Sequence, residues 1–332
     1  MLTADNINVD FANATNILIN YYNCIQSDIL DNKGRWEIAE LISQINNKYS
    51  SLLKDAYGQI WLLFLKQGGL NTNDNIYHLY KTYFQDRLHQ YFLKSPFCNR
   101  VYKKPLGYAG DYIMMKYIYD NILQGKDAFA KYIHHFSTNI EIAQAVRSRK
   151  KYIVDKITNL ISSKSCHITN IACGAAVEII DSVNNNNVLN NCTINLLDSD
   201  NNALNYIKNH ISQIGLAEKN IIINFFNNSI INIITNKTNI SNQDLIYSVG
   251  LFDYLSDKLF SFLNKGGILI VGNLKSNELI LRSYMELLGE WLINYRNEKD
   301  LLHIASMLNN AARISIEKDC YDIQLYLIVE KI

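Results

Sequence analysis

The fold is decided by the stretch His167-Ile168-Thr169-Asn170-Ile171-Ala172-Cys173-Gly174, which reads as a short apolar strand running into a glycine turn. The next residues, Ala175-Ala176-Val177-Glu178, are small or apolar and open a helix directly after the turn. A second strand, Cys192-Thr193-Ile194-Asn195-Leu196-Leu197, ends at Asp198-Ser199-Asp200. Strand, glycine turn, helix, strand and acid is the layout of a nucleotide-binding βαβ unit. The glycine lets a ligand approach the backbone, and the acid can accept hydrogen bonds from a ribose.

The rhythm of strand and helix continues to the end of the chain. Apolar runs of strand length alternate with helix-length segments, which is typical of a parallel sheet with helices on both faces. The last two strands are close enough in sequence to form an antiparallel hairpin, so we predict a Rossmann-like α/β domain over 151–332. Strands are expected at 167–172, 193–197, 221–226, 244–249, 267–272, 312–317 and 323–330, and helices near 175–183, 200–213, 254–264 and 276–290.

The first part of the chain, residues 1–150, is expected to form an all-helical domain. Glycine and proline are scarce up to about residue 95, and apolar residues recur at helical spacing. A helix from about Asn75 to Leu93 is rich in aromatic residues, and core packing is favoured over an aromatic binding site. The segment between Pro96 and Pro105 is not expected to be regular helix. It leads into a loop at 105–112, a candidate substrate loop or lid.

Composition argues against several classes of protein. The formal net charge is +1, so a nucleic-acid surface is not indicated. The N-terminus lacks a basic region followed by an apolar one, and no apolar run is long enough to span a bilayer. Six cysteines are scattered without a CxxC pair, which fits free thiols in the cytoplasm, and the histidines show no metal-binding spacing. We therefore expect a cytoplasmic protein without a metal site.

The glycine turn also bears on the choice of cofactor. A dinucleotide fold normally shows GxGxxG, but only Gly174 is present, followed by Ala175 and Ala176. S-adenosylmethionine (SAM) has no pyrophosphate and needs one close backbone approach rather than a phosphate cradle. A sheet of seven strands with a terminal hairpin is also the class I methyltransferase arrangement. SAM is therefore favoured over NAD, with a fold that has lost nucleotide binding as a third alternative.

Several motifs, in the same order, resemble one family. They are Pro105-Leu106-Gly107-Tyr108-Ala109-Gly110-Asp111-Tyr112, Ala172-Cys173-Gly174 with Glu178, Gly250-Leu251-Phe252-Asp253-Tyr254-Leu255, Val271-Gly272-Asn273 and Glu290-Trp291-Leu292-Ile293-Asn294-Tyr295-Arg296. Together they resemble the class I SAM-dependent methyltransferases known as extracellular-factor 3-hydroxypalmitic acid methyl ester biosynthesis proteins. The resemblance runs from about Pro105 to the C-terminus. One departure is Ala172, where many methyltransferases carry an acid.

This resemblance and the strand ends predict a cofactor site. Gly174 would contact the amino-acid end of SAM, and Asp198 the ribose hydroxyls. Asp200 and Asn201 would lie near the adenosine and Phe226 to Asn228 beside the adenine, although a plain strand end is an equal alternative for the latter. The predicted cofactor residues are Ala172, Cys173, Gly174, Glu178, Asp198, Ser199, Asp200, Phe226, Asn227, Ser248, Val249 and Gly250.

Other residues are candidates for the acceptor side of the site. The alternative for each is ordinary structure: a helix cap for Asp111, lid packing for Phe252 and Tyr254, and a solvated helix face for Arg147 or Arg149, which could instead neutralise a carboxylate. The predicted catalytic residues are Tyr108, Asp111, Tyr112, Tyr254, Tyr295 and Arg296.

The resemblance implies methyl transfer to the carboxylate of a small or fatty-acid-like substrate. A carboxylate is ionised at neutral pH and needs no general base. Two alternatives stay open: a lyase or cyclase that consumes the amino-acid part of SAM, and a non-catalytic protein that senses SAM. The expected partner is a small molecule, and a homodimer is left open.

Overall fold

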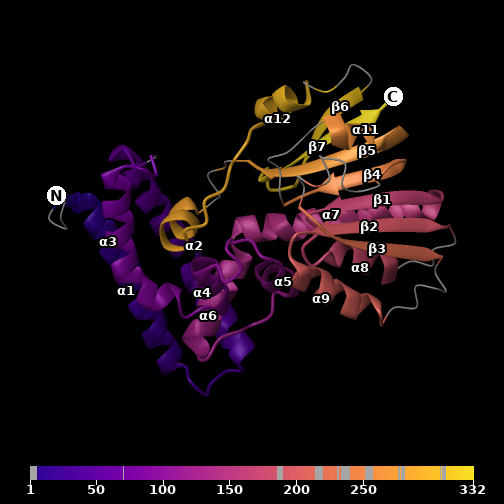
Figure 1. Cartoon of the computed structure of the whole chain (residues 1–332). Coiled ribbons are helices and arrows are strands. Elements are labelled where there is room, and N and C mark those ends of the chain that lie inside the picture. Colours follow the sequence, from indigo (N-terminus) through magenta and orange to yellow (C-terminus); the bar gives the residue numbers. More distant parts are fainter. Residues whose placement is uncertain are drawn as a thin grey trace. The chain divides into compact units, whose positions relative to one another are not determined.

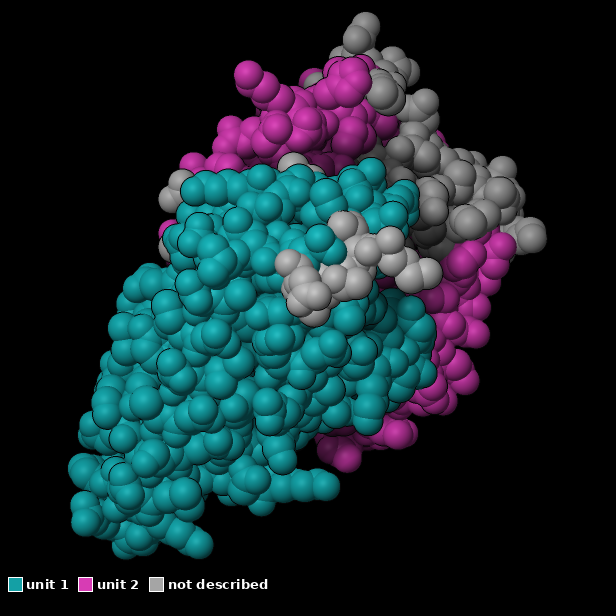
Figure 2. Space-filling view, turned by 90° about the vertical axis from the view of Figure 1, so that its left-hand side faces the viewer, with its two compact units in different colours: residues 1–144, 278–293 teal, residues 145–277, 294–332 magenta. Residues whose placement is uncertain are grey.

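The computed structural model describes residues 6–69, 71–184, 190–213, 220–229, 232, 240–250, 257–275, 277, 281–306, 308 and 312–332. The chain divides into two compact units, coloured in Figure 2. Unit 1 comprises Met1–Gln144 and Glu278–Ile293, and unit 2 comprises Ala145–Asn277 and Asn294–Ile332. This division differs in two places from the expected one at residues 150 and 151. The boundary falls in the first turn of a helix, Glu141–Ser163, and a segment between two strands belongs to the helical unit.

Unit 1 is built on three long helices, α1 (Val9–Asp31), α2 (Ile38–Lys66) and α3 (Asn75–Phe92) (Figure 1). Asp74 caps α3 by accepting the Ile76 N–H at 3.0 Å, which explains where the helix begins. Phe84 is fully buried, and Phe92 is 2% exposed. The Phe11 ring meets Tyr80 edge-on, with 4.8 Å between centroids. The aromatic face of α3 is therefore core, as the sequence predicts.

The expectation of irregular chain between Pro96 and Pro105 is wrong. Helix α4 spans Pro96–Lys103, with Pro96 at its first position and the Ser95 side chain accepting the Cys98 N–H. Proline is well suited to that position because its missing N–H would have no partner in the first turn. The helix ends at Lys103, and the next residue, Lys104, caps it in a left-handed conformation with φ 46°. Two further helices, α5 (Tyr112–Asp120) and α6 (Ala128–Asn139), follow in the same unit.

The helix expected at 276–290 takes a different form. Within the described residues of that range, Ser283–Leu288 forms a π-helix, η3, that lies in unit 1. The expected helix near 254–264 is also too long at its end, because strand β5 (Leu263–Leu274) already begins at Leu263 and the helix before it, α11, spans Asp257–Ser261. Helix α12 (Glu298–Ala305), which was not predicted from the sequence, begins with a capping box formed by Asn297 and Asp300.

Unit 2 contains a seven-stranded sheet in the order β3-β2-β1-β4-β5-β7-β6 (Figure 1). All neighbours are parallel except that β7 runs antiparallel to both β5 and β6. This confirms the predicted Rossmann-like class I methyltransferase sheet with its terminal hairpin. The strands are β1 (Cys166–Ile171), β2 (Cys192–Asp198), β3 (Ile221–Asn227), β4 (Gln243–Ser248), β5 (Leu263–Leu274), β6 (Ala312–Lys318) and β7 (Gln324–Lys331).

Apolar clusters cover both faces of this sheet. On one face, Ile168 and Ile194 pack with residues of α7 (Glu141–Ser163), α8 (Val177–Asn184) and α9 (Asn201–Ile211). On the other, Ile171 and Ile246 pack with residues of α11 and α12. The chain order reverses between β1 and β4, and ligands of open α/β sheets bind beside such a switch point, at the carboxyl ends of the strands.

Candidate cofactor site

The turn after β1 has an unusual backbone. Ala172, Gly174 and Ala176 all have positive φ angles, of 55°, 54° and 40°. Only glycine adopts this region without cost, and an alanine there is strained by roughly 1–2 kcal/mol. The Cys173 N–H donates to the Leu197 carbonyl oxygen at 3.0 Å, which fixes the turn to the neighbouring strand. Strain of this kind is maintained by the surrounding structure and gathers at functional sites, so the turn is a candidate ligand contact.

Asp198 closes the turn from the end of β2. Its Oδ2 accepts the Gly174 N–H at 2.7 Å, and its Oδ1 accepts the Asp200 N–H at 2.8 Å. Burial raises the pKa of Asp198, and these two backbone hydrogen bonds oppose that shift by favouring the ionised form. Each carboxylate oxygen has two lone pairs, so one further donor can bind each. The sequence expectation that the glycine turn and the strand-two acid lie together is thus met by a direct hydrogen bond.

The chain after Asp198 is tied to the end of β3. Asn227 Nδ2 donates to the Asp198 and Ser199 carbonyl oxygens at 3.2 and 3.1 Å. Asp200 Oδ1 accepts the Asn202 N–H at 2.8 Å and so caps α9. Phe226 packs against the apolar cluster on the face of α11 and α12. Of the residues predicted to lie near the adenosine, Asn227 and Asp200 therefore make hydrogen bonds within the chain at this edge of the sheet.

Glu178 lies buried in the first turn of α8. Its Oε1 accepts hydrogen bonds from Asn170 Nδ2 at 2.9 Å and from the Tyr247 hydroxyl at 3.0 Å. Burial raises the pKa of Glu178, while these hydrogen bonds and the nearby Arg149 cation lower it. Asn170 and Tyr247 were not predicted as site residues from the sequence. The sequence feature that could have indicated these two residues is a polar side-chain group on a mainly apolar strand, since buried parallel strands are near-continuous apolar runs.

Arg149 comes from α7 and reaches the end of β4. It is only 7% exposed, so the solvated-face alternative is wrong for this residue. Its Nη1 donates to the Val249 carbonyl oxygen. Ser248, the last residue of β4, is buried, and Gly250 is exposed. Arg149 thus fixes the chain leaving β4, beside the switch point.

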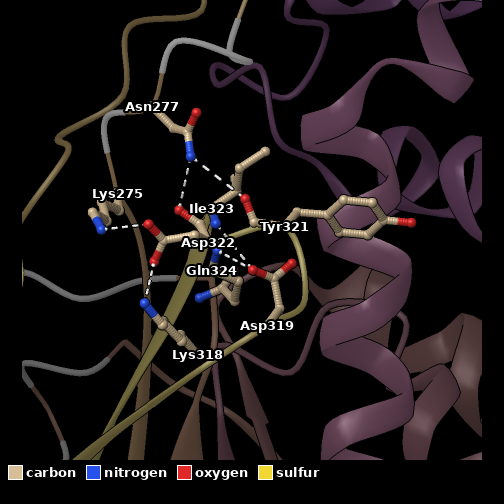
Figure 3. Close-up of polar contacts among 8 residues, drawn as sticks. All are labelled: Lys275, Asn277, Lys318, Asp319, Tyr321, Asp322, Ile323 and Gln324. Atoms are coloured by element: carbon tan, nitrogen blue, oxygen red, sulfur yellow. Dashed lines mark hydrogen bonds and ion pairs between the residues drawn. The ribbon is translucent and has the colours of Figure 1, made fainter.

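The other side of this edge is built around the turn between β6 and β7 (Figure 3). Because β7 runs antiparallel to β5 and Gln324 pairs with Leu274, this turn lies at the carboxyl end of β5. Lys275 Nζ donates to Asp322 Oδ2 at 2.7 Å, and Asn277 Nδ2 donates to the Asp322 carbonyl oxygen at 3.2 Å. The Lys275 ammonium lowers the pKa of Asp322 through this bond. Figure 3 also draws Lys318, Asp319, Tyr321 and Ile323, whose contacts hold the same turn.

Tyr295 and Arg296 return to the end of β5. The Arg296 N–H donates to the Leu274 carbonyl oxygen at 3.1 Å, and its Nη1 donates to Asn273 Oδ1 at 2.9 Å. Asn273 is buried, and its Nδ2 donates to the Leu274 carbonyl oxygen at 2.7 Å. The two predicted acceptor residues therefore lie on the same sheet edge as Gly174 and Asp198.

The remaining predicted residues fall in unit 1 or outside the described residues. Tyr108, Asp111 and Tyr112 belong to unit 1. Asp111 is fully buried, caps α5 by accepting the Met114 N–H at 2.9 Å, and binds Arg100 Nε with both oxygens at 2.8 Å. Tyr108 is 47% exposed. Tyr254, with Phe252, lies outside the described residues.

Two searches of the described residues concern other classes of site. No helix among them is long and apolar enough to cross a membrane. In the same part of the chain, no group of three or more His, Cys, Asp or Glu side chains is arranged to hold a metal ion.

Comparison with known proteins supports the fold. The structure is similar to that of a possible exported protein from Bordetella parapertussis, with a TM-score of 0.57 and 15% identity over 85% of this chain and 96% of that one. At this identity the likeness shows the fold alone. Two further structures are similar with TM-scores below 0.5: the pyocyanin biosynthetic protein PhzM (0.44, 11% identity, 94% of each chain) and magnesium protoporphyrin IX methyltransferase from Synechocystis PCC 6803 (0.42, 11% identity, 58% of this chain and 87% of that one). No family model matches the sequence, and the search of the curated proteins found no match.

Proposed function

We propose that this chain is a SAM-dependent methyltransferase that binds its cofactor at the carboxyl edge of the unit 2 sheet. The hydrogen bond from the Gly174 N–H to the Asp198 carboxylate carries the proposal. In dinucleotide-binding turns such N–H groups face a pyrophosphate. Here the Gly174 N–H already donates to the Asp198 carboxylate, whose negative charge would repel a phosphate. SAM has no phosphate, and its sulfonium and ammonium groups are cationic.

The residues around the turn fit such a ligand. Glu178, Asp198 and Asp200 gather at this edge, which favours a cation over an anion. The lone pairs that Asp198 keeps can accept the two ribose hydroxyls. A Cβ built on Gly174 would meet no heavy atom of the described residues within 4 Å, so the backbone there can be approached closely.

Bound SAM supplies a methyl group that its positive charge has already activated. The chain's own residues then have to align the acceptor and exclude water. Asp198 would orient the ribose, and Arg149, through the Val249 carbonyl oxygen, would hold the chain after β4 beside the turn. Tyr295 and Arg296, fixed at the end of β5 by Asn273, would face the acceptor.

The proposed acceptor is the carboxylate of a small or fatty-acid-like substrate. The motif resemblance to the 3-hydroxypalmitic acid methyl ester biosynthesis proteins supports this choice. A carboxylic acid with a pKa near 4 is ionised at neutral pH, so no residue has to remove a proton.

Calorimetric titration with S-adenosylhomocysteine (SAH) tests the cofactor. The parent protein should bind SAH, and Asp198→Asn should weaken binding about 10- to 100-fold, because it removes a charged acceptor of hydrogen bonds. The matched control is Asp244→Asn at the amino end of β4. Asp244 likewise accepts a backbone N–H, from His167 at 2.9 Å, but at the opposite edge of the sheet. Equal affinity of Asp198→Asn and the parent would contradict the site.

Turnover tests the reaction. The protein is incubated with labelled SAM and a panel of carboxylic acids, and methyl esters are measured together with methylthioadenosine. Esters formed over several turnovers support the proposal. Methylthioadenosine released from SAM alone would instead identify a lyase or cyclase, and SAH binding without any turnover would identify a sensor.

A further inference from the structure

Two cysteines lie side by side at the amino edge of the unit 2 sheet, opposite to the candidate cofactor site. Cys166 is the first residue of β1, and Cys192 is the first residue of β2. They are register partners, and their sulfur atoms are 3.2 Å apart. Their side chains are 1% and 2% exposed. The pair could not be predicted from the sequence, because no local pattern indicates which residues of different strands become register partners.

The geometry allows a covalent bond between them. Neighbouring strands are about 4.8 Å apart, within the Cα separation of roughly 4.4–6.8 Å that disulfides span. A disulfide needs about 2.05 Å between its sulfur atoms, so each sulfur has to move by only about half an ångström. Rotation about the Cα–Cβ bonds supplies such a shift without moving the strands. Paired residues of parallel strands point to the same face, so both side chains already face one another.

The two thiols share a hydrogen bond in which either sulfur can be the donor. The thiolate is the reactive form of cysteine, so either sulfur can attack an oxidant while its neighbour resolves the product. The residues that precede each of them, Ser165 and Asn191, are exposed, so the pair lies one residue from the surface at this edge.

We propose that Cys166 and Cys192 form a redox-active dithiol that a peroxide oxidises to an intrachain disulfide. The thiolate of one cysteine attacks one peroxide oxygen, the O–O bond breaks, and the leaving hydroxide takes the proton that this thiol lost and becomes water. The other sulfur then attacks the resulting sulfenic acid and displaces its hydroxyl, which leaves with the second thiol's proton as a second water. The two thiols lose two protons and two electrons in total, and one peroxide becomes two waters.

The disulfide would stabilise unit 2 without changing ligand binding. It closes a loop from residue 166 to residue 192 and so restricts the unfolded chain. We expect the melting temperature of unit 2 to rise by roughly 5 °C or more. The six residues of β1 separate the pair from the glycine turn by roughly 20 Å, so SAH affinity should stay within about twofold.

The experiment uses the full chain with the exposed cysteines removed, Cys24→Ser with Cys320→Ser. One equivalent of hydrogen peroxide is added, and intact mass, a non-reducing peptide map and the melting temperature are measured. We expect a mass loss of two hydrogens, a linked peptide containing both residues, and reversal by dithiothreitol. Adding Cys192→Ser, which is nearly isosteric, should abolish the mass loss and the thermal shift.

Other outcomes would overturn the proposal. Oxygen addition without loss of two hydrogens would mean that the thiols do not pair, and so would a linked peptide containing Cys98 or Cys173 instead. If Cys192→Ser does not fold, the peptide map of the protein that keeps both residues decides the question alone. A mass loss that persists in a folded Cys192→Ser variant would also exclude this pair.

Discussion

At the scale of single residues, the turn after β1 has backbone conformations that its residue types do not indicate. The sequence predicts a glycine turn at Gly174, and in the structure Gly174 has a φ angle of 54°. Ala172 and Ala176 adopt the same kind of backbone, although alanine gives no hint of it. Glycine in the sequence therefore marks one position of this turn, whereas three of its residues have a positive φ angle. The hydrogen-bond partners of Glu178 could not be predicted either, because Asn170 and Tyr247 lie on two strands whose pairing no local sequence pattern indicates.

Replacing Ala172 with glycine tests this backbone. Glycine removes roughly 1–2 kcal/mol of left-handed strain and loses about 0.5–1 kcal/mol through greater freedom of the unfolded chain. We expect Ala172→Gly to leave the free energy of unfolding unchanged or to raise it by about 1 kcal/mol, measured by urea denaturation. The control is Ala203→Gly within α9, which should lower that free energy by about 1 kcal/mol or more. Equal destabilisation by the two variants would exclude the left-handed assignment.

At the scale of elements, a row of polar side chains crosses four strands of the sheet. Asn224 Nδ2 donates to Asn195 Oδ1 at 3.0 Å, and Asn195 Nδ2 donates to Thr169 Oγ1 at 3.1 Å. Thr169 Oγ1 in turn donates to Gln243 Oε1 at 2.7 Å. Thr169, Asn195 and Gln243 are buried, so every donor and acceptor in the row has to keep its partner. A strand that slipped by one residue would break the row, which helps to fix the register.

Thr169→Val tests the row with almost no change of shape. Valine removes the hydroxyl and leaves the Asn195 donor and the Gln243 acceptor without that partner. We expect the free energy of unfolding to fall by about 2–4 kcal/mol, since each unsatisfied buried group costs about 1–3 kcal/mol. The same substitution at the half-buried Thr193 of β2 is the control and should stay within about 0.5 kcal/mol. Similar losses at both positions would mean that the hydroxyl of Thr169 contributes nothing special.

The π-helix η3 shows why one element could not be predicted. Gln85 and His89, both on α3, reach the end of η3: Gln85 Nε2 donates to the Leu287 carbonyl oxygen at 2.7 Å, and His89 Nε2 lies 3.0 Å from that of Leu288. Lys104 Nζ donates to the Glu290 carbonyl oxygen at 2.8 Å. These partners lie far away in sequence, so the apolar pattern alone predicted an ordinary helix in the sheet domain.

At the scale of the whole molecule, the features that depend on periodicity were predictable and those that depend on distant contacts were not. The seven strands and the terminal hairpin follow from apolar runs and their spacing, and the sheet has them. The assignment of Glu278–Ile293 to unit 1 does not follow from such a pattern, because residues of unit 2 flank that segment on both sides in the sequence. Since each unit has its own core, we expect the chain to unfold in two transitions rather than one.

A buried histidine should make the unit 1 transition sensitive to pH. His134 is fully buried, its Nδ1 accepts the Phe97 N–H at 3.4 Å, and burial lowers the pKa of His134 to about 4. Because the folded pKa lies below the unfolded value of about 6.5, the neutral form contributes stability that is complete above pH 6.5 and is lost as pH falls toward 4. The loss should reach roughly 3 kcal/mol, and calorimetry between pH 7 and pH 4 would show it as a falling unit 1 transition. His134→Gln should flatten that dependence, whereas His303→Gln, exposed on α12 of unit 2, should not. An unchanged slope in His134→Gln would assign the pH dependence to other groups.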